Sequence, residues 1–225
     1  MWPASVLLAW FVYRHQDKFK DKAVIELGAG CGLGGFLAAH WSKQTLLTDG
    51  NEIVVRLMAQ NQAFLELDPA QHSVAMLLWG QQEALSELLR EKNFDAINKP
   101  CVVIGADVIL WPNQINPLML TIYWLLRGNP RESVCYISYV VRAQSTTRRL
   151  FAAARQVGLE VLEFPLLSFL SEEEVTGIGA AEKHLFRFAL DVEREERVGG
   201  ALPSREAMIR EHLGQNPEYA MGLPC

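Results

Sequence analysis

A glycine-rich stretch near the start of the chain has the residue types of a nucleoside-binding site. The run from Val24 to Leu27 is apolar except for Glu26, which is the pattern of a short buried strand. Three glycines follow at alternate positions, Gly28, Gly30 and Gly32. Glycine lets the backbone turn tightly and approach a ligand, because no Cβ stands in the way. The apolar helical pattern from Leu33 to Trp41 then predicts a helix N-terminus, whose free N–H groups suit a carboxylate or a phosphate.

An acidic residue completes this pattern. Asp49 follows a second short apolar strand, expected at Thr45 to Thr48. A carboxylate at this position of a nucleotide-binding fold accepts hydrogen bonds from ribose hydroxyls. Strand, glycine loop, helix, strand and acid together predict half of a nucleoside-binding α/β fold.

The position of Glu26 bears on which nucleoside is bound. A dinucleotide fingerprint can be placed on Gly30, Gly32 and Gly35, but its first glycine then lies three residues past the strand. An acid in the strand end would repel a pyrophosphate, whereas it can pair with the ammonium of an amino-acid moiety. S-adenosylmethionine has such an ammonium and no phosphate. This favours the methyl donor over a nicotinamide cofactor, and a purely structural glycine turn is the third alternative.

Two later strands also end in residues that could do chemistry. The stretch Cys101 to Ala106 is entirely apolar, as expected of a strand buried on both faces, and Asp107 follows it. Ligands of open parallel sheets lie beyond the carboxyl ends of the strands, so Asp107 is expected between cofactor and substrate, although it could instead cap the next helix. Trp79-Gly80 follows a strand expected at 74–78, where the indole can lie along an adenine or simply pack in the core.

The remaining patterns predict one α/β domain and a tail. An opening helix begins at Pro3, and the acidic run at 172–174 falls in a long loop expected at 165–184. Further helices are expected at 51–66, 82–92, 114–127 and 145–157, and further strands at 134–141, 159–164 and 185–192. The domain is therefore expected to cover 1–192, followed by a charged tail at 193–225 with one surface helix from 203 to about 213.

Composition limits the function classes. The chain has 225 residues, half of them hydrophobic, and a formal net charge of −5. This charge argues against direct nucleic-acid binding through a basic face and fits a basic protein substrate. Neither a signal peptide nor a membrane span is predicted. The four cysteines have neither metal-ligand spacing nor the density of a disulfide framework, which predicts reduced thiols, no metal, and a cytoplasmic or nuclear protein.

The ordered set of motifs resembles the seven-β-strand S-adenosylmethionine-dependent methyltransferases of the family 16 protein-methylating group. The residues that carry the resemblance are Trp2-Pro3-Ala4, Val6 to Ala9, Ile25 to Gly32, Thr48-Asp49, Asn61, Trp79-Gly80, Gly105 to Ile109, Thr121 to Tyr123, Asn129-Pro130, Tyr139 to Arg142 and Pro165 to Phe169. The resemblance covers residues 2 to about 191. It implies a Rossmann-like doubly wound α/β sheet of seven strands, mostly parallel, with the last strand antiparallel.

The resemblance also implies roles for individual residues. Asp107 would be the catalytic residue that holds the substrate nitrogen, and Asn61 would brace the glycine loop. The implied cofactor contacts are Trp2, Glu26, Gly28, Gly30, Gly32, Asp49, Trp79, Gly80 and Ala106, with Glu26 at the amino end of S-adenosylmethionine. The implied substrate contacts are Leu110, Trp111, Tyr139 and Arg142.

This sequence departs from the family pattern in two places. Relatives usually have an aromatic residue three positions after the acid represented by Asp107, whereas this chain has Leu110 there, with Trp111 next. Relatives also have a segment before the Trp-Pro pair that helps cover the cofactor, and this chain begins at Met1-Trp2. The cofactor lid is therefore expected to be incomplete.

The resemblance implies methylation of a protein side-chain nitrogen. Arginine, histone arginine included, is favoured over lysine. The alternatives are a protein-lysine methyltransferase and a catalytically inactive methyltransferase fold that binds a partner. A small-molecule methyltransferase is disfavoured, because the sequence has no dedicated lid domain.

Overall fold

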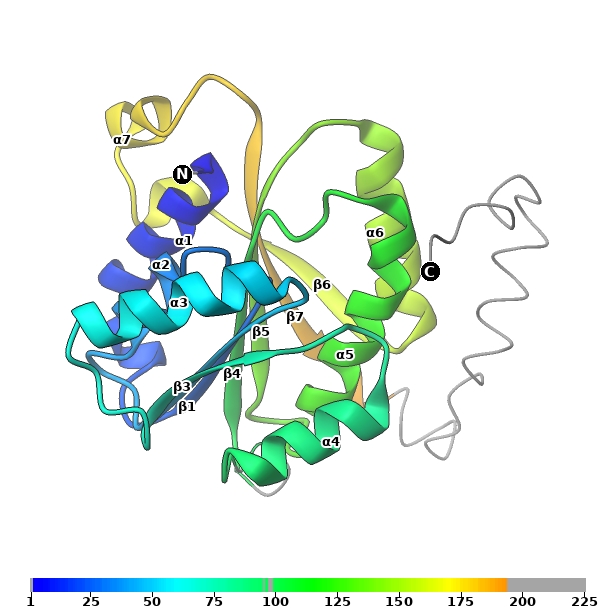
Figure 1. Cartoon of the computed structure of the whole chain (residues 1–225). Coiled ribbons are helices and arrows are strands. Elements are labelled where there is room, and N and C mark those ends of the chain that lie inside the picture. Colours follow the sequence, from blue (N-terminus) through cyan, green and yellow to red (C-terminus); the bar gives the residue numbers. More distant parts are fainter. Residues whose placement is uncertain (1, 95, 97–98, 194–225) are drawn as a thin grey trace. The chain divides into compact units, whose positions relative to one another are not determined.

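A seven-stranded sheet forms the centre of the computed structural model, which describes residues 2–94, 96 and 99–193 (Figure 1). The strand order is β3-β2-β1-β4-β5-β7-β6. The strands are Ala23–Leu27 (β1), Gln44–Asp49 (β2), His72–Met76 (β3), Cys101–Ala106 (β4), Val134–Val140 (β5), Leu159–Phe164 (β6) and Lys183–Leu190 (β7). Neighbours from β3 to β5 are parallel, whereas β7 runs antiparallel to both β5 and β6. The expected fold class is confirmed.

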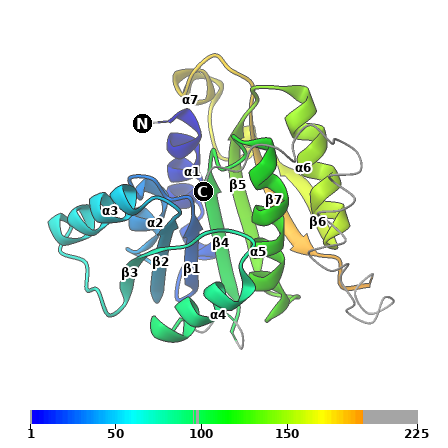
Figure 2. The ribbon, with the colours of Figure 1, turned by 45° about the vertical axis from the view of Figure 1, so that its right-hand side comes forward.

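Helices cover both faces of this sheet (Figure 2). They are Pro3–Arg14 (α1), Leu33–Ala38 (α2), Glu52–Phe64 (α3), Gln82–Glu91 (α4), Ile115–Arg127 (α5), Gln144–Gln156 (α6) and Glu172–Gly177 (α7). On one face, α1 and α2 enclose a core with β1, β4 and β5 that includes Phe11, Ala38 and Ile104. On the other face, α5 packs between α4 and α6 and against β4. Burial on both faces explains why β4 is apolar throughout.

The strand order creates a crevice between β1 and β4. From β1 the chain passes through α2 to β2 on one side, while β4 pairs with β1 on the other side. The loops after these strands therefore diverge at their carboxyl ends, which is where ligands bind in open α/β sheets. The residues that follow β1, β2 and β4 are Gly28, Gly50 and Asp107.

The segment expected as the loop 165–184 contains two short helices. A 3₁₀ helix spans Leu166–Ser168, and α7 follows. The Ser171 hydroxyl accepts a hydrogen bond from the Glu174 N–H, and the Glu174 carboxylate accepts one from the Ser171 N–H. This reciprocal capping box places the acidic run in the first helical turn, where the helix dipole favours negative charge. Glu174 also pairs with Arg14 of α1 at 3.1 Å.

The described residues up to Val192 belong to one compact unit. The tail helix expected near 203–213 lies outside the described residues. Within the described part, no helix combines the length and the hydropathy needed to cross a membrane. No three His, Cys, Asp or Glu side chains in that part are grouped so that they could hold a metal ion.

Candidate active site

A cavity of about 530 Å³ lies beyond the carboxyl ends of β1, β2 and β4. Its lining includes nine of the residues that the sequence predicted for the site: Trp2, Gly28, Gly30, Asp49, Trp79, Ala106, Asp107, Leu110 and Trp111. Five other predicted residues are not among the lining residues: Glu26, Gly32, Gly80, Tyr139 and Arg142. The fold therefore brings together residues from five separate stretches of the chain.

The glycine loop is positioned by neighbours on both sides. The Ala29 N–H donates to the Thr48 carbonyl at 2.9 Å, and the Asn61 amide of α3 donates to the Cys31 carbonyl at 2.9 Å. The bracing of this loop by Asn61 is thus observed. Gly28 has a φ of +63°, and a Cβ there would lie 2.8 Å from a Val108 methyl carbon. The loop therefore keeps its backbone open to the cavity only with glycine at this position.

Asp49 lies on the cavity wall with a partly satisfied carboxylate. Its Oδ2 accepts from the Gly30 N–H at 3.1 Å, and its Oδ1 accepts from the Asn51 N–H at 3.0 Å. Each carboxylate oxygen has a second lone pair, so the side chain can accept two further hydrogen bonds. A pair of neighbouring hydroxyls, such as a ribose diol, matches this capacity.

Trp79 and Gly80 follow β3 but play different parts. The strand ends at Met76, two residues earlier than expected, and Trp79 lines the cavity beside Gly28. Gly80 lies behind it, with a φ of +77°, and its N–H donates to the Thr121 hydroxyl of α5 at 2.9 Å. Gly80 therefore does not line the cavity. It turns the chain directly after Trp79, whose indole remains at the cavity wall.

Glu26 is placed differently from the prediction that it meets the amino end of the cofactor. Its side chain is buried, and Oε2 accepts from the Gly35 N–H of α2 at 2.7 Å. Burial raises the pKa of Glu26 to about 8, against the lowering effect of the Gly35 bond, and the charge of Asp49 also raises it. The Glu26 carboxyl group is engaged by the Gly35 N–H, and Glu26 is not among the cavity-lining residues. In this structure Glu26 anchors the helix that follows the glycine loop.

Gly32 has a related structural position. It precedes α2 with a φ of +84°, and a Cβ there would meet the Phe36 ring and a Leu47 methyl group within 3 Å. Glycine is therefore required for packing between α2 and β2. Gly32 shapes the loop without reaching the cavity.

The Glu26 environment gives a pH-dependent prediction. A pKa raised from 4.5 to about 8 on folding means that this carboxyl's contribution to stability is complete below about pH 4.5 and is lost as the pH rises to about 8. In Glu26→Gln the amide oxygen still accepts from Gly35 and cannot ionise. Urea unfolding measures the free energy of unfolding at about pH 5 and about pH 9. Between these pH values, Glu26→Gln is expected to lose a few kcal/mol less of this free energy than wild type does. Equal losses in both proteins would contradict this interpretation.

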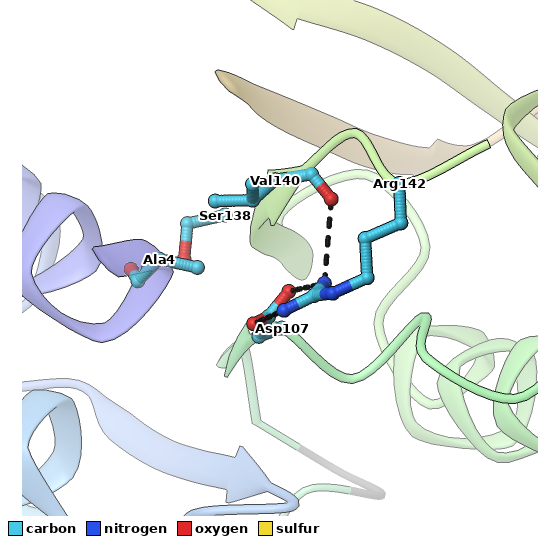
Figure 3. A network of polar contacts seen from close by, with 5 residues as sticks. All are labelled: Ala4, Asp107, Ser138, Val140 and Arg142. Atoms are coloured by element: carbon cyan, nitrogen blue, oxygen red, sulfur yellow. Dashed lines mark hydrogen bonds and ion pairs between the residues drawn. The ribbon is translucent and has the colours of Figure 1, made fainter. Parts of the chain in front are cut away.

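Asp107 forms an ion pair with Arg142 at the edge of the cavity (Figure 3). Two guanidinium nitrogens donate to the two carboxylate oxygens, each at 2.5 Å, and one also donates to the Val140 carbonyl at 3.4 Å. The Asp107 side chain is 5% exposed, and that of Arg142 is 36% exposed. The hydrogen bond with Asp107 raises the pKa of Arg142. Arg142 does not itself line the cavity, but it contacts Asp107, which does.

The backbone around Asp107 is fixed by the neighbouring strand and by α1. Asp107 has a φ of +58°, and its N–H donates to the Ser138 carbonyl of β5 at 2.9 Å. The Ser138 hydroxyl donates to the Ala4 carbonyl at 2.7 Å (Figure 3). These bonds connect the Asp107 backbone, β5 and the start of α1, which Trp2 directly precedes.

The Trp2 ring lies beside the ion pair, and Trp111 lines the same cavity. Trp2 and Trp111 are largely exposed, and the Arg142 guanidinium carbon lies 5.5 Å from the centre of the Trp2 ring. Tyr139 is not in this group, contrary to the expected substrate contact. It is fully buried, its ring packs near Phe186, and its hydroxyl accepts from Thr147 of α6.

The cavity also contains residues that the sequence did not single out. Ser5, Cys31, Asn51 and Gln114 supply polar atoms, and Leu77, Leu78 and Val108 supply apolar surface. Most of them are near neighbours of predicted residues in the chain. Five of them, Cys31, Asn51, Leu77, Leu78 and Val108, lie within a few residues of a strand end, whereas Ser5 lies in α1 and Gln114 in a short 3₁₀ helix.

A family profile described as "Lysine methyltransferase" matches residues 1–156, which include the glycine loop, Asp49 and Asp107. The chain belongs to this family. Relatives extend the similarity: histone-arginine methyltransferase METTL23 of Mus musculus is 26% identical over 197 residues, covering 85% of this chain and 74% of the relative. The protein of the same name from Homo sapiens is 27% identical, and 98% of it is covered. Calmodulin-lysine N-methyltransferase of Arabidopsis thaliana is 31% identical over 140 residues, covering 61% of this chain and 43% of the relative.

Solved structures show the same fold. A putative methyltransferase from Streptococcus mutans, in complex with SAH, has a TM-score of 0.53 at 12% identity and covers 80% of this chain and 97% of its own. A putative RNA methyltransferase from Pyrococcus horikoshii has a TM-score of 0.51 at 18% identity, covering 83% and 81%. The family member described here is thus an S-adenosylmethionine-dependent methyltransferase.

The cavity residues fit this cofactor. Gly28 and Gly30 leave the loop backbone open, Asp49 has two acceptor sites to spare, and Trp79 offers an aromatic surface beside them. A nucleoside with an amino-acid moiety requires these features: a diol acceptor, a face for the base and an accessible backbone.

Proposed function

We propose that this methyltransferase methylates a guanidinium nitrogen of arginine in a basic protein. The observation that carries the proposal is the Asp107 carboxylate, which lies on the cavity wall and holds a guanidinium through both of its oxygens. The histone-arginine methyltransferases that match 85% of this chain support it. The net charge of −5 is consistent with a cationic substrate.

The cofactor would be held by three groups along the cavity. Asp49 would accept the ribose hydroxyls, Trp79 would lie along the adenine, and Gly28 and Gly30 would admit the amino-acid end. Bound S-adenosylmethionine supplies an activated methyl group. Trp2 and Ala106 line the same cavity and would exclude water from it.

Asp107 would act on the substrate side. A guanidinium remains charged before reaction, because its pKa is above about 12. Asp107 would orient its planar N–H groups and accept the proton that the methylated nitrogen releases. Leu110 and Trp111 follow Asp107 on the cavity wall and would contact the aliphatic part of the substrate side chain.

Lysine is the second candidate acceptor. The family description and the calmodulin-lysine relative favour it. A lysine ammonium must lose its proton before it can attack, and it presents a point charge instead of a planar fork. The pairing of both Asp107 oxygens with a planar guanidinium supports arginine over lysine.

Methyl-labelled cofactor tests the choice directly. The chain is incubated with two basic peptides that differ only by arginine or lysine at one central position, and with mixed core histones. We expect label on the arginine peptide at a rate at least about tenfold above that of the lysine peptide, with the labelled residue located by fragmentation mass spectrometry. Label on lysine alone would overturn the arginine assignment.

A further inference from the structure

Arg142 makes the contacts that a substrate arginine would need. Its guanidinium forms two parallel bonds to Asp107 and lies over the Trp2 ring, and both of these residues line the cavity. The side chain comes from the segment between β5 and α6 and reaches across to the end of β4 (Figure 3). The chain therefore places one of its own guanidinium groups on the carboxylate proposed to receive a substrate.

Two guanidinium groups cannot both use this carboxylate in the same way. A fork-to-fork pair takes one N–H on each carboxylate oxygen in a common plane, and the low exposure of Asp107 leaves little approach from other directions. A substrate arginine must therefore displace Arg142 to reach the same position.

The exposures of the two partners favour such an exchange. Asp107 is nearly buried, so leaving its charge without a partner would be costly. Arg142 is far more exposed and can return to water, losing its contact with Trp2 and a long bond to the Val140 carbonyl. One planar guanidinium replacing another leaves Asp107 paired both before and after the exchange.

We propose that Arg142 is an internal competitor that occupies the acceptor site until a substrate guanidinium displaces it. This rests on the proposed function of Asp107 and extends it to the regulation of the same site. The exchange also selects the substrate class. An incoming guanidinium restores both parallel bonds, whereas an ammonium is a point donor and does not reproduce the planar pair.

Removing the competitor while keeping its aliphatic length tests the proposal. Ethylguanidinium and ethylammonium chlorides serve as probes at constant ionic strength, and binding is followed by tryptophan fluorescence. If the occupied form holds nine tenths or more of the molecules, Arg142→Met is expected to lower the Kd for ethylguanidinium about tenfold or more. The gain for ethylammonium is expected to be smaller. In turnover, the KM for the arginine peptide is expected to fall more than kcat changes.

Two further variants serve as controls for the Arg142→Met result. Arg90→Met removes an exposed arginine of α4 that pairs with Glu87 on the same helix, and should leave both Kd values at the wild-type level. Arg142→Lys retains the charge without the fork and should give an intermediate Kd. Thermal unfolding of each variant shows whether the fold is intact, and Arg142→Gln replaces Arg142→Met if that variant is unstable.

The outcomes separate this inference from the proposed function. An unchanged or higher Kd for ethylguanidinium in Arg142→Met and Arg142→Gln overturns the competitor role, even if wild type methylates arginine. If wild type labels only lysine, the proposed function fails, and the probe titration still decides whether Arg142 competes. Equal gains for both probes overturn the inferred selectivity for guanidinium.

Discussion

Asp107→Asn is expected to lower kcat by about 10²- to 10⁴-fold, the range for losing a positioned acid–base group. Asparagine retains the shape of the side chain, but it has one acceptor oxygen in place of two and cannot take a proton near neutral pH. Cofactor affinity should remain within a few-fold of wild type, because Asp49 and the glycine loop are separate from this position. Single-turnover rates and calorimetric titration of S-adenosylmethionine measure the two effects independently.

The Arg142 partner must be controlled in this experiment. Asp107→Asn leaves a guanidinium without its carboxylate, so part of a rate loss could come from a displaced Arg142 side chain. The double variant Asp107→Asn/Arg142→Met removes that cation as well. A low kcat in both variants assigns the loss to the carboxylate, whereas recovery in the double variant would contradict a catalytic role for Asp107.

The fold could be predicted where burial alone determines the pattern. The bounds of β4 and β6 were predicted correctly, and those of α4, α5 and α6 differ by one residue at most. Strands with buried polar residues were harder. β3 begins at His72, whose ring forms a 2.9 Å hydrogen bond with the Thr45 hydroxyl on the neighbouring strand. Such a cross-strand partner makes a polar residue acceptable in a strand, and hydropathy does not reveal it.

The ends of β7 and the helix α7 were missed for similar reasons. β7 begins at Lys183, two residues earlier than expected, and the Lys183 ammonium donates to the Gly179 carbonyl at 2.6 Å. The acidic run at 172–174 suggested a solvated loop, although the Ser171 and Glu174 spacing was a capping signal.

The candidate site could be predicted as a set of strand ends, but not in its side-chain contacts. The sequence placed Asp107 and Arg142 each after a strand, one as the catalytic residue and the other as a substrate contact. The register Ala106 to Ser138 brings the segments after β4 and β5 together. Whether the Asp107 and Arg142 side chains form an ion pair depends on which of their rotamers fit between these two segments. Glu26 shows the same limit, because its place in the strand does not say whether the carboxyl faces a ligand or the Gly35 N–H.

Asp49→Ala is expected to raise the Kd for S-adenosylmethionine roughly 100-fold, because two hydrogen bonds to a charged group contribute at least about 1.5 kcal/mol each. The substitution removes both acceptor sites that face the cavity. It also removes the bonds from the Gly30 and Asn51 N–H groups, so the loop itself could shift. Calorimetric titration with the cofactor gives the affinity, and thermal unfolding gives the structural cost.

Asn61→Ala separates these two causes. It releases the glycine loop from α3 at the Cys31 carbonyl, while Asn61 is not among the cavity-lining residues. If Asp49 binds the ribose directly, Asn61→Ala should weaken cofactor binding by less than about tenfold, the effect of one neutral hydrogen bond. If Asn61→Ala weakens cofactor binding as much as Asp49→Ala does, the position of the glycine loop controls the affinity. The proposal that Asp49 binds the ribose directly would then be wrong. Asp49→Asn should lie between them, because its amide oxygen can still accept while its NH₂ group cannot.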